Sequence, residues 1–388
     1  MDQVNQRPPV DRARALGPAI AAAADEIEAT QTIPEPLLTD LYDAGLWRLF
    51  LPRSLGGEEA HPSAYLEALM EIASHDGSVG WNMFVANSSL LLAPFIPLES
   101  AQAIWGDPRA VICWGPPNAC RLKAEPGGYR VDGEWDFASG SRQATWAGAH
   151  AQVEEPDGSL RLNDHGKPLI RSVLFPVAHA EFLDKWNPIG MKGTASDSYR
   201  VKDLFVPETF SGTREEPALR RDRGPLYAFT MQGLYAVGVA GVALGIARAM
   251  LAAFSDLAQT KAPRGRPRLA DDAATQSDYA RAEAKLGAGQ AYLASILNDV
   301  YERANDIAPI GIEDRAMVRL GCSTAIQNAV EVADWVHRAA GVSAIFPGSP
   351  FERRFRDIHT LSQQIQSRPA HFEAVGQVLL GNPPQVFF

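Results

Sequence analysis

Two histidines near the C-terminus are the side chains in this sequence best suited to acid–base chemistry. His359 lies three residues after Arg356 and four before Gln363, a spacing that puts the three on one face of a helix. An imidazole that titrates near neutral pH can take a proton from a weakly acidic substrate or return one. His359 is therefore the first candidate for an acid or base and His371 the second. The alternative for each is a structural histidine at a helix end.

Motifs of several common active sites are missing. The sequence has no G-x-G-x-x-G after a strand, no G-x-x-x-x-G-K-[ST] and no G-x-S-x-G, so the usual dinucleotide fold, phosphate loop and nucleophile elbow lack their parts. Glu71 and His75 share a helical face, but no second pair with matching spacing completes a metal site. We expect no bound metal and no usual site for NAD(P)H.

The composition excludes several other classes. Hydrophobic residues make up 46% and charged residues 21%, as in an ordinary globular chain, and the net charge of -10 opposes nucleic-acid binding. Cys113, Cys120 and Cys322 show no C-x-x-C spacing, so we expect no disulfide framework and a cytoplasmic location. Residues 1–10 have no apolar run typical of a secretory signal. The longest apolar stretch, 234–247, is shorter than the roughly 20 residues of a membrane span, so we predict none.

The elements that must position these groups fall into three blocks. Residues 1–108 show helical periodicity, and 109–213 show short alternating segments with three hairpin signals, Gly127-Gly128, Asp132-Gly133 and Asp157-Gly158. After a charged linker at 214–223, the helical period returns over 224–388. Small residues there at helical spacing permit a neighbouring helix to approach closely; they are Gly238, Gly241 and Gly245. We predict a helical domain, a β domain and a helical bundle.

Three stretches of the sequence, in order and spacing, resemble the acyl-CoA dehydrogenase superfamily. They read Pro52-Arg53-Ser54-Leu55-Gly56-Gly57, Gly133-Glu134-Trp135-Asp136-Phe137-Ala138-Ser139-Gly140-Ser141 and Gly190-Met191-Lys192-Gly193-Thr194-Ala195-Ser196. Ala340-Gly341 and Arg356-Asp357 resemble its C-terminal helices, so the likeness covers nearly the whole chain. Residues 135–141 and 356–361 look more like its flavin-dependent monooxygenase branch, the oxygenase components of two-component aromatic hydroxylases.

The resemblance implies an α+β fold with an N-terminal α-helical domain, a β-barrel-like middle domain and a C-terminal four-helix bundle. Such chains assemble as homotetramers or homodimers, with flavin between the last two domains. One departure matters for the chemistry. Acyl-CoA dehydrogenases commonly follow the terminal Arg-Asp with a Tyr-Glu-Gly segment whose glutamate removes the α-proton of the thioester. Here residues 363–368 read Gln-Gln-Ile-Gln-Ser-Arg, which supplies no carboxylate base.

The resemblance also assigns contacts with the flavin. Ser139 stands at its flavin-contacting hydroxyl position, and Ser139 and Ser141 can hydrogen-bond to the ring. A turn serine that bonds its own backbone is the alternative for either. The other predicted cofactor residues are Trp114, Trp186, Lys192, Thr194, Ser196 and Arg264. For Trp186 the alternative is a core position, and for Arg264 a solvated loop.

Predicted substrate contacts follow in the same way. The helix that lines the substrate cavity in relatives carries Trp81, Asn87 and Ser88, and Gln364 stands about where several relatives have a histidine. The histidines expected for binding a phenolate are missing, which favours an indole-like substrate over a phenol. Arg356 and Asp357 are expected to tie the bundle together through an ion pair rather than to act in catalysis.

The function implied by the resemblance is a monooxygenase. It would take reduced FMN or FAD from a separate NAD(P)H-dependent flavin reductase and add O2 to form C4a-hydroperoxyflavin. One oxygen would then pass to a small aromatic or heteroaromatic substrate, with Ser139, His359 and His371 as catalytic candidates. Two alternatives stay open: an acyl-CoA dehydrogenase or oxidase with a displaced glutamate, and a flavin-binding protein without catalysis.

Overall fold

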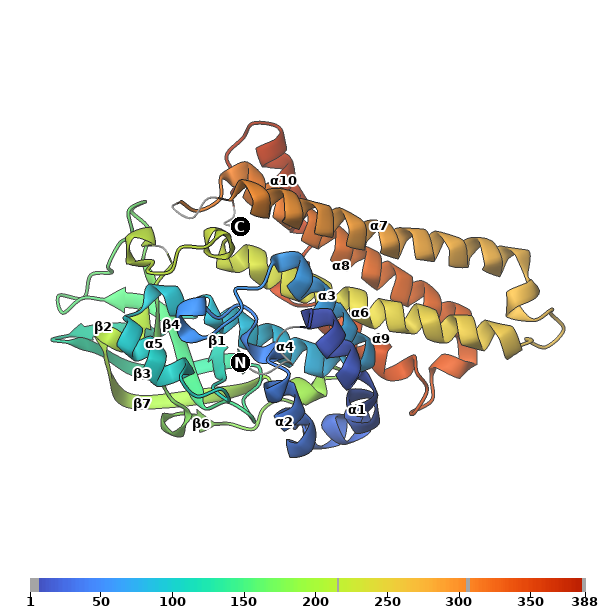
Figure 1. The fold of residues 1–388 in the computed structure, drawn as a ribbon, viewed down its shortest axis with the longest axis horizontal. Coiled ribbons are helices and arrows are strands. Elements are labelled where there is room, and N and C mark those ends of the chain that lie inside the picture. The colour runs from blue at the N-terminus through green and yellow to red at the C-terminus, as the bar shows by residue number, and fades with distance from the viewer. Residues whose placement is uncertain (1–6, 215, 305–307, 386–388) are drawn as a thin grey trace.

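The chain folds into a helical N-terminal part, a mixed β-sheet and a helical C-terminal part (Figure 1). The structure is a computed structural model that describes residues 7–214, 216–304 and 308–385. Within the stretch 1–10, where we expect no secretory signal, residues 1–6 lie outside the described part. The predicted α+β class with its α, β, α order is confirmed. The domain limits at 1–108, 109–213 and 224–388 stay predictions.

The N-terminal part consists of five α-helices with short 3-10 turns between them. Its helices are α1 (Pro9–Thr30), α2 (Glu35–Asp43), α3 (Pro62–His75), α4 (Gly77–Leu90) and α5 (Leu98–Trp105). The helix α4 begins at an N-cap, where the Asp76 carboxylate accepts a hydrogen bond from the Val79 amide at 2.9 Å. Every residue of α4 is buried, because the helix lies against both α6 and strand β1. It therefore carries its side chains directly into the middle of the molecule.

The middle part is one eight-stranded sheet. Its strands are β1 (Ile112–Gly115), β2 (Arg121–Glu125), β3 (Gly128–Ala138), β4 (Trp146–Glu154), β5 (Ile170–Pro176), β6 (Glu181–Phe182), β7 (Asp197–Pro207) and β8 (Ser211–Gly212). The strands follow the order β6-β7-β3-β2-β4-β5-β8, and β1 also pairs with β4. The strand β4 runs parallel to β1 and β2, whereas the other pairs are antiparallel. One face buries a core of its own, with the rings of Trp135 and Tyr199 stacked 5.7 Å apart.

The hairpin signals of the sequence have different outcomes. Gly127 has a φ of 82° and turns the chain between β2 and β3, as predicted. Gly158 has a φ of 84° in the turn before the bridge between Glu154 and Leu160. The prediction of a turn at Asp132-Gly133 is wrong, because both residues lie inside β3, where the pairing with β7 shifts its register between Val131 and Gly133. An irregularity of this kind bends a strand instead of ending it.

Three long helices and two short ones form the C-terminal part. They are α6 (Met231–Thr260), α7 (Ala273–Arg303), α8 (Ile312–Ala340), α9 (Glu352–Leu361) and α10 (Ala370–Leu379). The long helices run side by side and extend away from the sheet (Figure 1). The small residues of α6 permit close packing as predicted: a Cβ on Gly238 would lie 2.2 Å from Phe84, and one on Gly245 would lie 2.4 Å from the Met70 carbonyl.

The helix α6 is more apolar than the stretch 234–247 suggested. By length and composition it is long enough to cross a membrane, but 78% of its most apolar window is buried inside the protein. Such burial is typical of the core helix of a folded domain, which meets the same length and composition test. The helix packs on α3, α4 and α8. Its hydrophobic surface is therefore used by the fold itself.

Candidate functional site

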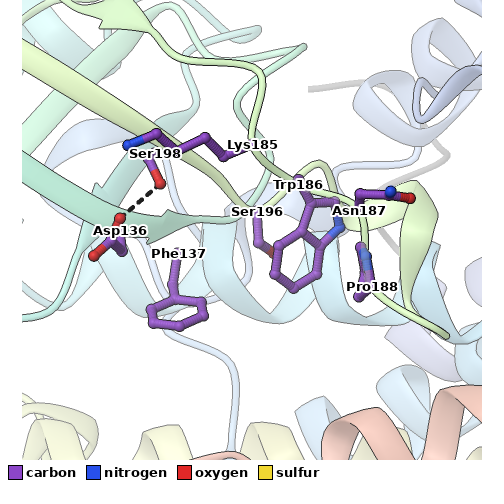
Figure 2. A pocket seen from close by; sticks show the side chains of 8 residues that line it. All are labelled: Asp136, Phe137, Lys185, Trp186, Asn187, Pro188, Ser196 and Ser198. Atoms are coloured by element: carbon purple, nitrogen blue, oxygen red, sulfur yellow. Dashed lines mark hydrogen bonds between the residues drawn. The ribbon is translucent and has the colours of Figure 1, made fainter.

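A pocket of about 290 Å³ lies on the middle domain, where β3 and β7 meet the segment before β7 (Figure 2). It is lined by Asp136, Phe137, Lys185, Trp186, Asn187, Pro188, Ser196 and Ser198. The rings of Phe137 and Trp186 stand nearly perpendicular, with centroids 6.4 Å apart. Phe137 is 62% exposed, although it is a large apolar residue. The pocket thus has aromatic walls, hydroxyl groups and one lysine.

The backbone around this pocket is strained. Seven residues other than glycine have a positive φ in the described chain, and four of them lie at the pocket or in the segment before β7. These four are Phe137 (63°), Asp184 (52°), Met191 (55°) and Ala195 (42°). Such conformations cost on the order of 1 kcal/mol or more each, and they gather at functional sites where surrounding contacts enforce them.

A chain of buried hydroxyl groups runs behind the pocket. The Trp81 indole Nε1 donates to the Ser139 Oγ at 3.0 Å, and the Ser139 Oγ lies 2.6 Å from the Ser196 Oγ. The Ser196 Oγ lies 2.7 Å from the Thr194 Oγ1, which donates to the Met191 carbonyl at 2.8 Å. We call Ser139, Ser196 and Thr194 the hydroxyl chain; all three are buried. Four predicted residues, from α4, the turn directly after β3 and the segment before β7, are thereby brought together.

The backbone of Met191 anchors the hydroxyl chain and the pocket wall. Its carbonyl also accepts a hydrogen bond from the Trp186 indole at 3.2 Å, and its amide donates to the Asp357 carboxylate at 2.5 Å. Arg356, the neighbour of Asp357 on α9, donates to the Ile189 carbonyl at 2.6 Å. A Cβ on Gly190 would lie 2.3 Å from the Arg356 backbone, so only glycine permits this approach. The C-terminal helix α9 therefore holds the segment between β6 and β7, residues 183–196, which shapes the pocket and which we call the site loop.

The predicted ion pair of Arg356 and Asp357 is wrong, because each residue makes its own separate contacts. Arg356 pairs with Glu28 of α1 at 2.7 Å and with Glu352 at 2.5 Å, whereas Asp357 bonds the backbone of the site loop. Burial alone would raise the pKa of Glu28, but hydrogen bonds from Arg356 and Arg353 outweigh it and lower that pKa. Arg356 thus ties α9 to the N-terminal helices, while Asp357 positions the site.

The surroundings of Asp357 disfavour the charged form of its carboxyl group. It is almost fully buried, and burial, together with the nearby Asp76 carboxylate, raises its pKa to about 7. The Met191 amide and Arg356 act in the opposite direction but do not cancel the effect of burial. Burial also raises the pKa of Asp76. Asp357 on α9 and Asp76 at the start of α4 are therefore two interacting acidic side chains with raised pKa values.

Ser141 and Lys192, also predicted to contact the flavin, lie close in sequence to members of the hydroxyl chain but are not part of it. The Ser141 Oγ donates to the Ala195 carbonyl at 2.7 Å and so stabilises the same segment. The Lys192 ammonium points to Glu28 of α1, 4.0 Å away. A contact of either residue with a cofactor stays a prediction.

The predicted acid–base candidates lie on other surfaces of the C-terminal helices. The His359 Nε2 lies 2.9 Å from the Asp334 carboxylate of α8, whereas Asp357 of the same helix faces the site loop. The expected helical face shared with Gln363 is wrong, because α9 ends at Leu361. The His371 Nε2 donates to the Ile365 carbonyl at 2.8 Å, and burial lowers the pKa of His371. Their catalytic roles stay predictions.

The predicted substrate residues other than Trp81 bond to nearby backbone. The Asn87 amide group accepts from the Phe50 amide at 3.2 Å and donates to the Leu46 carbonyl at 2.8 Å. The Ser88 hydroxyl donates to the Val85 carbonyl at 2.8 Å. The Gln364 side chain accepts from the Gln366 amide at 2.6 Å and caps a short 3-10 turn. These contacts explain the side chains structurally and leave the substrate roles as predictions.

Six of the eight predicted cofactor residues lie outside the pocket lining: Ser139, Ser141, Lys192 and Thr194, described above, and Trp114 and Arg264. Trp114 is buried in β1 and packs against the ring of His150 at 4.4 Å; burial lowers the pKa of that histidine to about 4, so it is neutral at pH 7. Arg264 lies in the exposed loop between α6 and α7, at the end of the bundle remote from the sheet (Figure 1). Arg264 is not among the residues that line the pocket.

Sequence reasoning missed several members of the site. Of the eight lining residues, it named only Trp186 and Ser196. Asp136 and Phe137 lie inside the quoted motif, and Asn187 and Pro188 directly follow Trp186, so their positions in the sequence could have found them. No local signal could have shown the contact between Met191 and Asp357, which are 166 positions apart.

Comparisons with known proteins agree with this arrangement. The model of the acyl-CoA dehydrogenase N-terminal domain matches residues 11–98, and that of the C-terminal domain matches residues 237–369. Indole-3-acetate monooxygenase from Pseudomonas putida is 29% identical, with 99% of each chain covered. Flavin-dependent monooxygenase, oxygenase subunit HsaA, from Rhodococcus jostii is 26% identical over 90% of this chain and 92% of its own.

A solved structure shows the same fold over almost the entire chain. XiaF from Streptomyces sp., in complex with FADH2 and glycerol, superposes with a TM-score of 0.89 and covers 98% of this chain and 96% of its own. Its sequence identity is 24%. At that identity the likeness establishes the fold and nothing finer.

Proposed function

This chain belongs to the acyl-CoA dehydrogenase superfamily, and we propose that within it the protein is the oxygenase component of a two-component flavin-dependent monooxygenase. The observation that carries the proposal is the pocket: two aromatic walls, a chain of buried hydroxyls along one side and a loop held in a strained conformation by α9. Relatives that match over more than nine-tenths of their length are named as a monooxygenase of indole-3-acetate and as an oxygenase subunit.

The residues of the pocket fit a flavin ring. Its volume lies near the lower end of the range for small-molecule sites, about 300 to 1,000 Å³. That space suits the ring system of a flavin, while the ribityl and phosphate portion would lie outside it. Phe137 and Trp186 supply flat apolar surfaces, and hydroxyl groups face the polar edge of such a ring. Lys185 adds a positive charge beside the pocket, 3.7 Å from Glu134.

Each group of this chain then has a defined task. Reduced flavin, when bound, supplies the electrons that activate O2. Phe137 and Trp186 would hold the faces of the ring, and the hydroxyl chain would orient its polar edge. Asp357 and Met191 keep Trp186 and Thr194 in place. We retain His359 as the proposed acid or base, with its ring oriented by Asp334.

We propose a small aromatic or heteroaromatic substrate and favour an indole-like one over a phenol. A relative matching over 99% of both chains is named for indole-3-acetate. The helix α4, which carries Trp81, has none of the histidines expected for binding a phenolate. Gln364 is turned toward its own turn and not toward an open site.

The dehydrogenase alternative lacks its base. Residues 363–368 carry no carboxylate, and they follow the end of α9 and include a short 3-10 turn. Asp357 is a carboxyl group near the site, but its Oδ1 bonds to the Met191 amide in the protein interior. Its task there is positioning, and α-proton abstraction would need a base within hydrogen-bond reach of the substrate.

Further properties belong to the same proposal. An oxygenase component implies a separate NAD(P)H-dependent flavin reductase, since this chain has no usual nicotinamide motif. The net charge of -10 argues against a nucleic-acid partner. Cys113, Cys120 and Cys322 are free thiols, which suits a cytoplasmic protein. We propose a homotetramer or homodimer, in which Arg264 of one subunit meets the flavin phosphate of another.

A coupled assay tests the proposed function. The purified chain is mixed with a flavin reductase, NADH, FMN or FAD, and indole or indole-3-acetate in air. We expect an oxygenated aromatic product that requires both this chain and reduced flavin. A chain that instead bleaches a bound flavin with an acyl-CoA, and yields no oxygenated product, would be a dehydrogenase.

A further inference from the structure

The hydrogen bonds of the hydroxyl chain can run in only one direction, from Trp81 toward Met191. One end is the Trp81 indole N–H, which only donates, and the other end is the Met191 carbonyl, which only accepts. Thr194 directs its single proton to the Met191 carbonyl. Ser196 must therefore donate to Thr194, and Ser139 must donate to Ser196. Four protons fill four hydrogen bonds, and none is left over.

This order decides what the hydroxyl chain offers to the pocket. Ser196 lines the pocket, but its proton points away to Thr194. Ser139 likewise directs its proton to Ser196. Each of these two oxygens keeps one lone pair and no proton for a ligand. The hydroxyl chain is therefore an acceptor, and it matches a ligand atom that carries a proton.

The order is difficult to reverse. The Met191 carbonyl is held by the Trp186 indole on one side, and its amide is held by Asp357. Thr194 is 1% exposed, so no solvent replaces a broken bond there. Turning its proton away would leave two buried oxygen atoms facing each other without a proton between them.

The oxidised and reduced forms of a flavin ring differ at one edge atom in whether that atom can donate a hydrogen bond to the hydroxyl chain. Its N5 accepts a hydrogen bond in the oxidised form and carries a proton in the reduced form. We propose that Thr194, by fixing the direction of the hydroxyl chain, makes this pocket select reduced over oxidised flavin. The inference rests on the proposed function, because it requires flavin in the pocket. Thr194 is a positioning residue, which acts through Ser196.

Equilibrium binding of both redox forms of FMN tests this role. The dissociation constants of oxidised FMN and of dithionite-reduced FMN are measured anaerobically for the wild type, Thr194→Val, Thr194→Ser and Ser196→Ala. We expect the wild type to bind reduced FMN more tightly. Thr194→Val frees the Ser196 proton to face the pocket, so oxidised FMN should bind about five-fold more tightly, the factor for one net hydrogen bond. The midpoint potential of the bound flavin should fall by about 20 mV.

The other variants separate positioning from packing. Thr194→Ser keeps the hydroxyl and should restore the wild-type ratio of the two constants. Ser196→Ala removes one of the two acceptors and frees the Ser139 proton, so it should weaken the binding of reduced FMN and change the ratio in the same direction as Thr194→Val. Thr145→Val makes the same replacement elsewhere in the middle domain, where the hydroxyl bonds the Val111 backbone, and should leave the ratio unchanged.

The failures can be distinguished. A wild type that binds neither redox form of FMN, nor of FAD in the same titration, would contradict the proposed function and this inference together. A wild type that binds both forms equally, or a Thr194→Val variant with the wild-type ratio, would overturn the role of Thr194 alone. If Thr194→Val does not fold, Thr194→Ser and Ser196→Ala decide, because a ratio unchanged in Ser196→Ala would also overturn it.

Discussion

Asp357 links the C-terminal helices to the site loop, and its replacement by asparagine tests that link without changing its shape. The Asn Oδ1 can still accept the hydrogen bond from the Met191 amide, but the side chain can no longer ionise. Asp76, Arg356, Arg354 and Glu28 are the charged groups around it. Asp357→Asn therefore removes a titration from the protein interior and leaves the loop contact in place.

The size of the effect follows from the raised pKa. An aspartate in the unfolded chain has a pKa of 3.8, and in the folded protein burial and Asp76 raise the pKa of Asp357 to about 7. Between these values the unfolded state releases a proton that the native state keeps. Stability contributed by this group is thus complete below pH 3.8 and is lost as the pH rises to 7. Each pH unit in that window costs about 1.4 kcal/mol, so the loss from pH 5 to pH 7 is about 2 kcal/mol.

Denaturant unfolding at pH 5 and pH 7 measures this difference. We expect the free energy of unfolding of Asp357→Asn, relative to the wild type, to rise by about 2 kcal/mol between the two pH values. Asp256→Asn changes an exposed aspartate of α6 and should follow the wild type at both. If Asp357→Asn lost stability with pH as the wild type does, the buried carboxyl would not be the group that titrates, and the reasoning would be refuted.

Three further substitutions test individual side chains. Trp186→Ala removes one wall of the pocket and should raise the dissociation constant of reduced FMN about ten-fold, measured by anaerobic titration; an unchanged constant would place the flavin elsewhere. Asn87→Ala leaves buried backbone groups of Phe50 and Leu46 unpaired and should lower the free energy of unfolding by about 2 kcal/mol. One ordinary hydrogen bond contributes about 1 kcal/mol. A loss of unfolding free energy below about 0.5 kcal/mol in denaturant titration would therefore contradict the structural role of Asn87. His359→Ala should lower the yield of oxygenated product per reduced flavin while flavin still binds, and an unchanged yield would remove it from the mechanism.

The local sequence pattern predicted the α, β, α order of the fold and most, but not all, of its turns and close contacts. The helical spacing of Gly238, Gly241 and Gly245 predicted close packing, and a Cβ at Gly238 or Gly245 would collide with α4 or α3. Gly127 predicted a hairpin because a positive φ is a local property of the chain. Asp132-Gly133 carries the same turn signal but lies in a strand, since pairing with β7 on one side and β2 on the other overrides it.

The site was predictable only where its residues are close in sequence. Ser139, Thr194 and Ser196 lie in two short motifs, and the structure brings these motifs together. The contact of Asp357 with Met191 depends on how α9 docks on the middle domain, which no local spacing encodes. His359 shares a short helix with Asp357, but the helix rotates it toward α8. The strained φ of Phe137 likewise results from tertiary contacts and has no signature in the residue itself.

Isotope labelling tests the central claim most directly. The chain is supplied with reduced FMN or FAD, indole or indole-3-acetate, and ¹⁸O2, and the aromatic product is analysed by mass spectrometry. A monooxygenase places one atom of O2 in the product and the other in water, so we predict a product that carries one ¹⁸O. Complete oxidation of the flavin to give only hydrogen peroxide with every aromatic compound tried, or a product whose oxygen comes from water, would contradict the assignment.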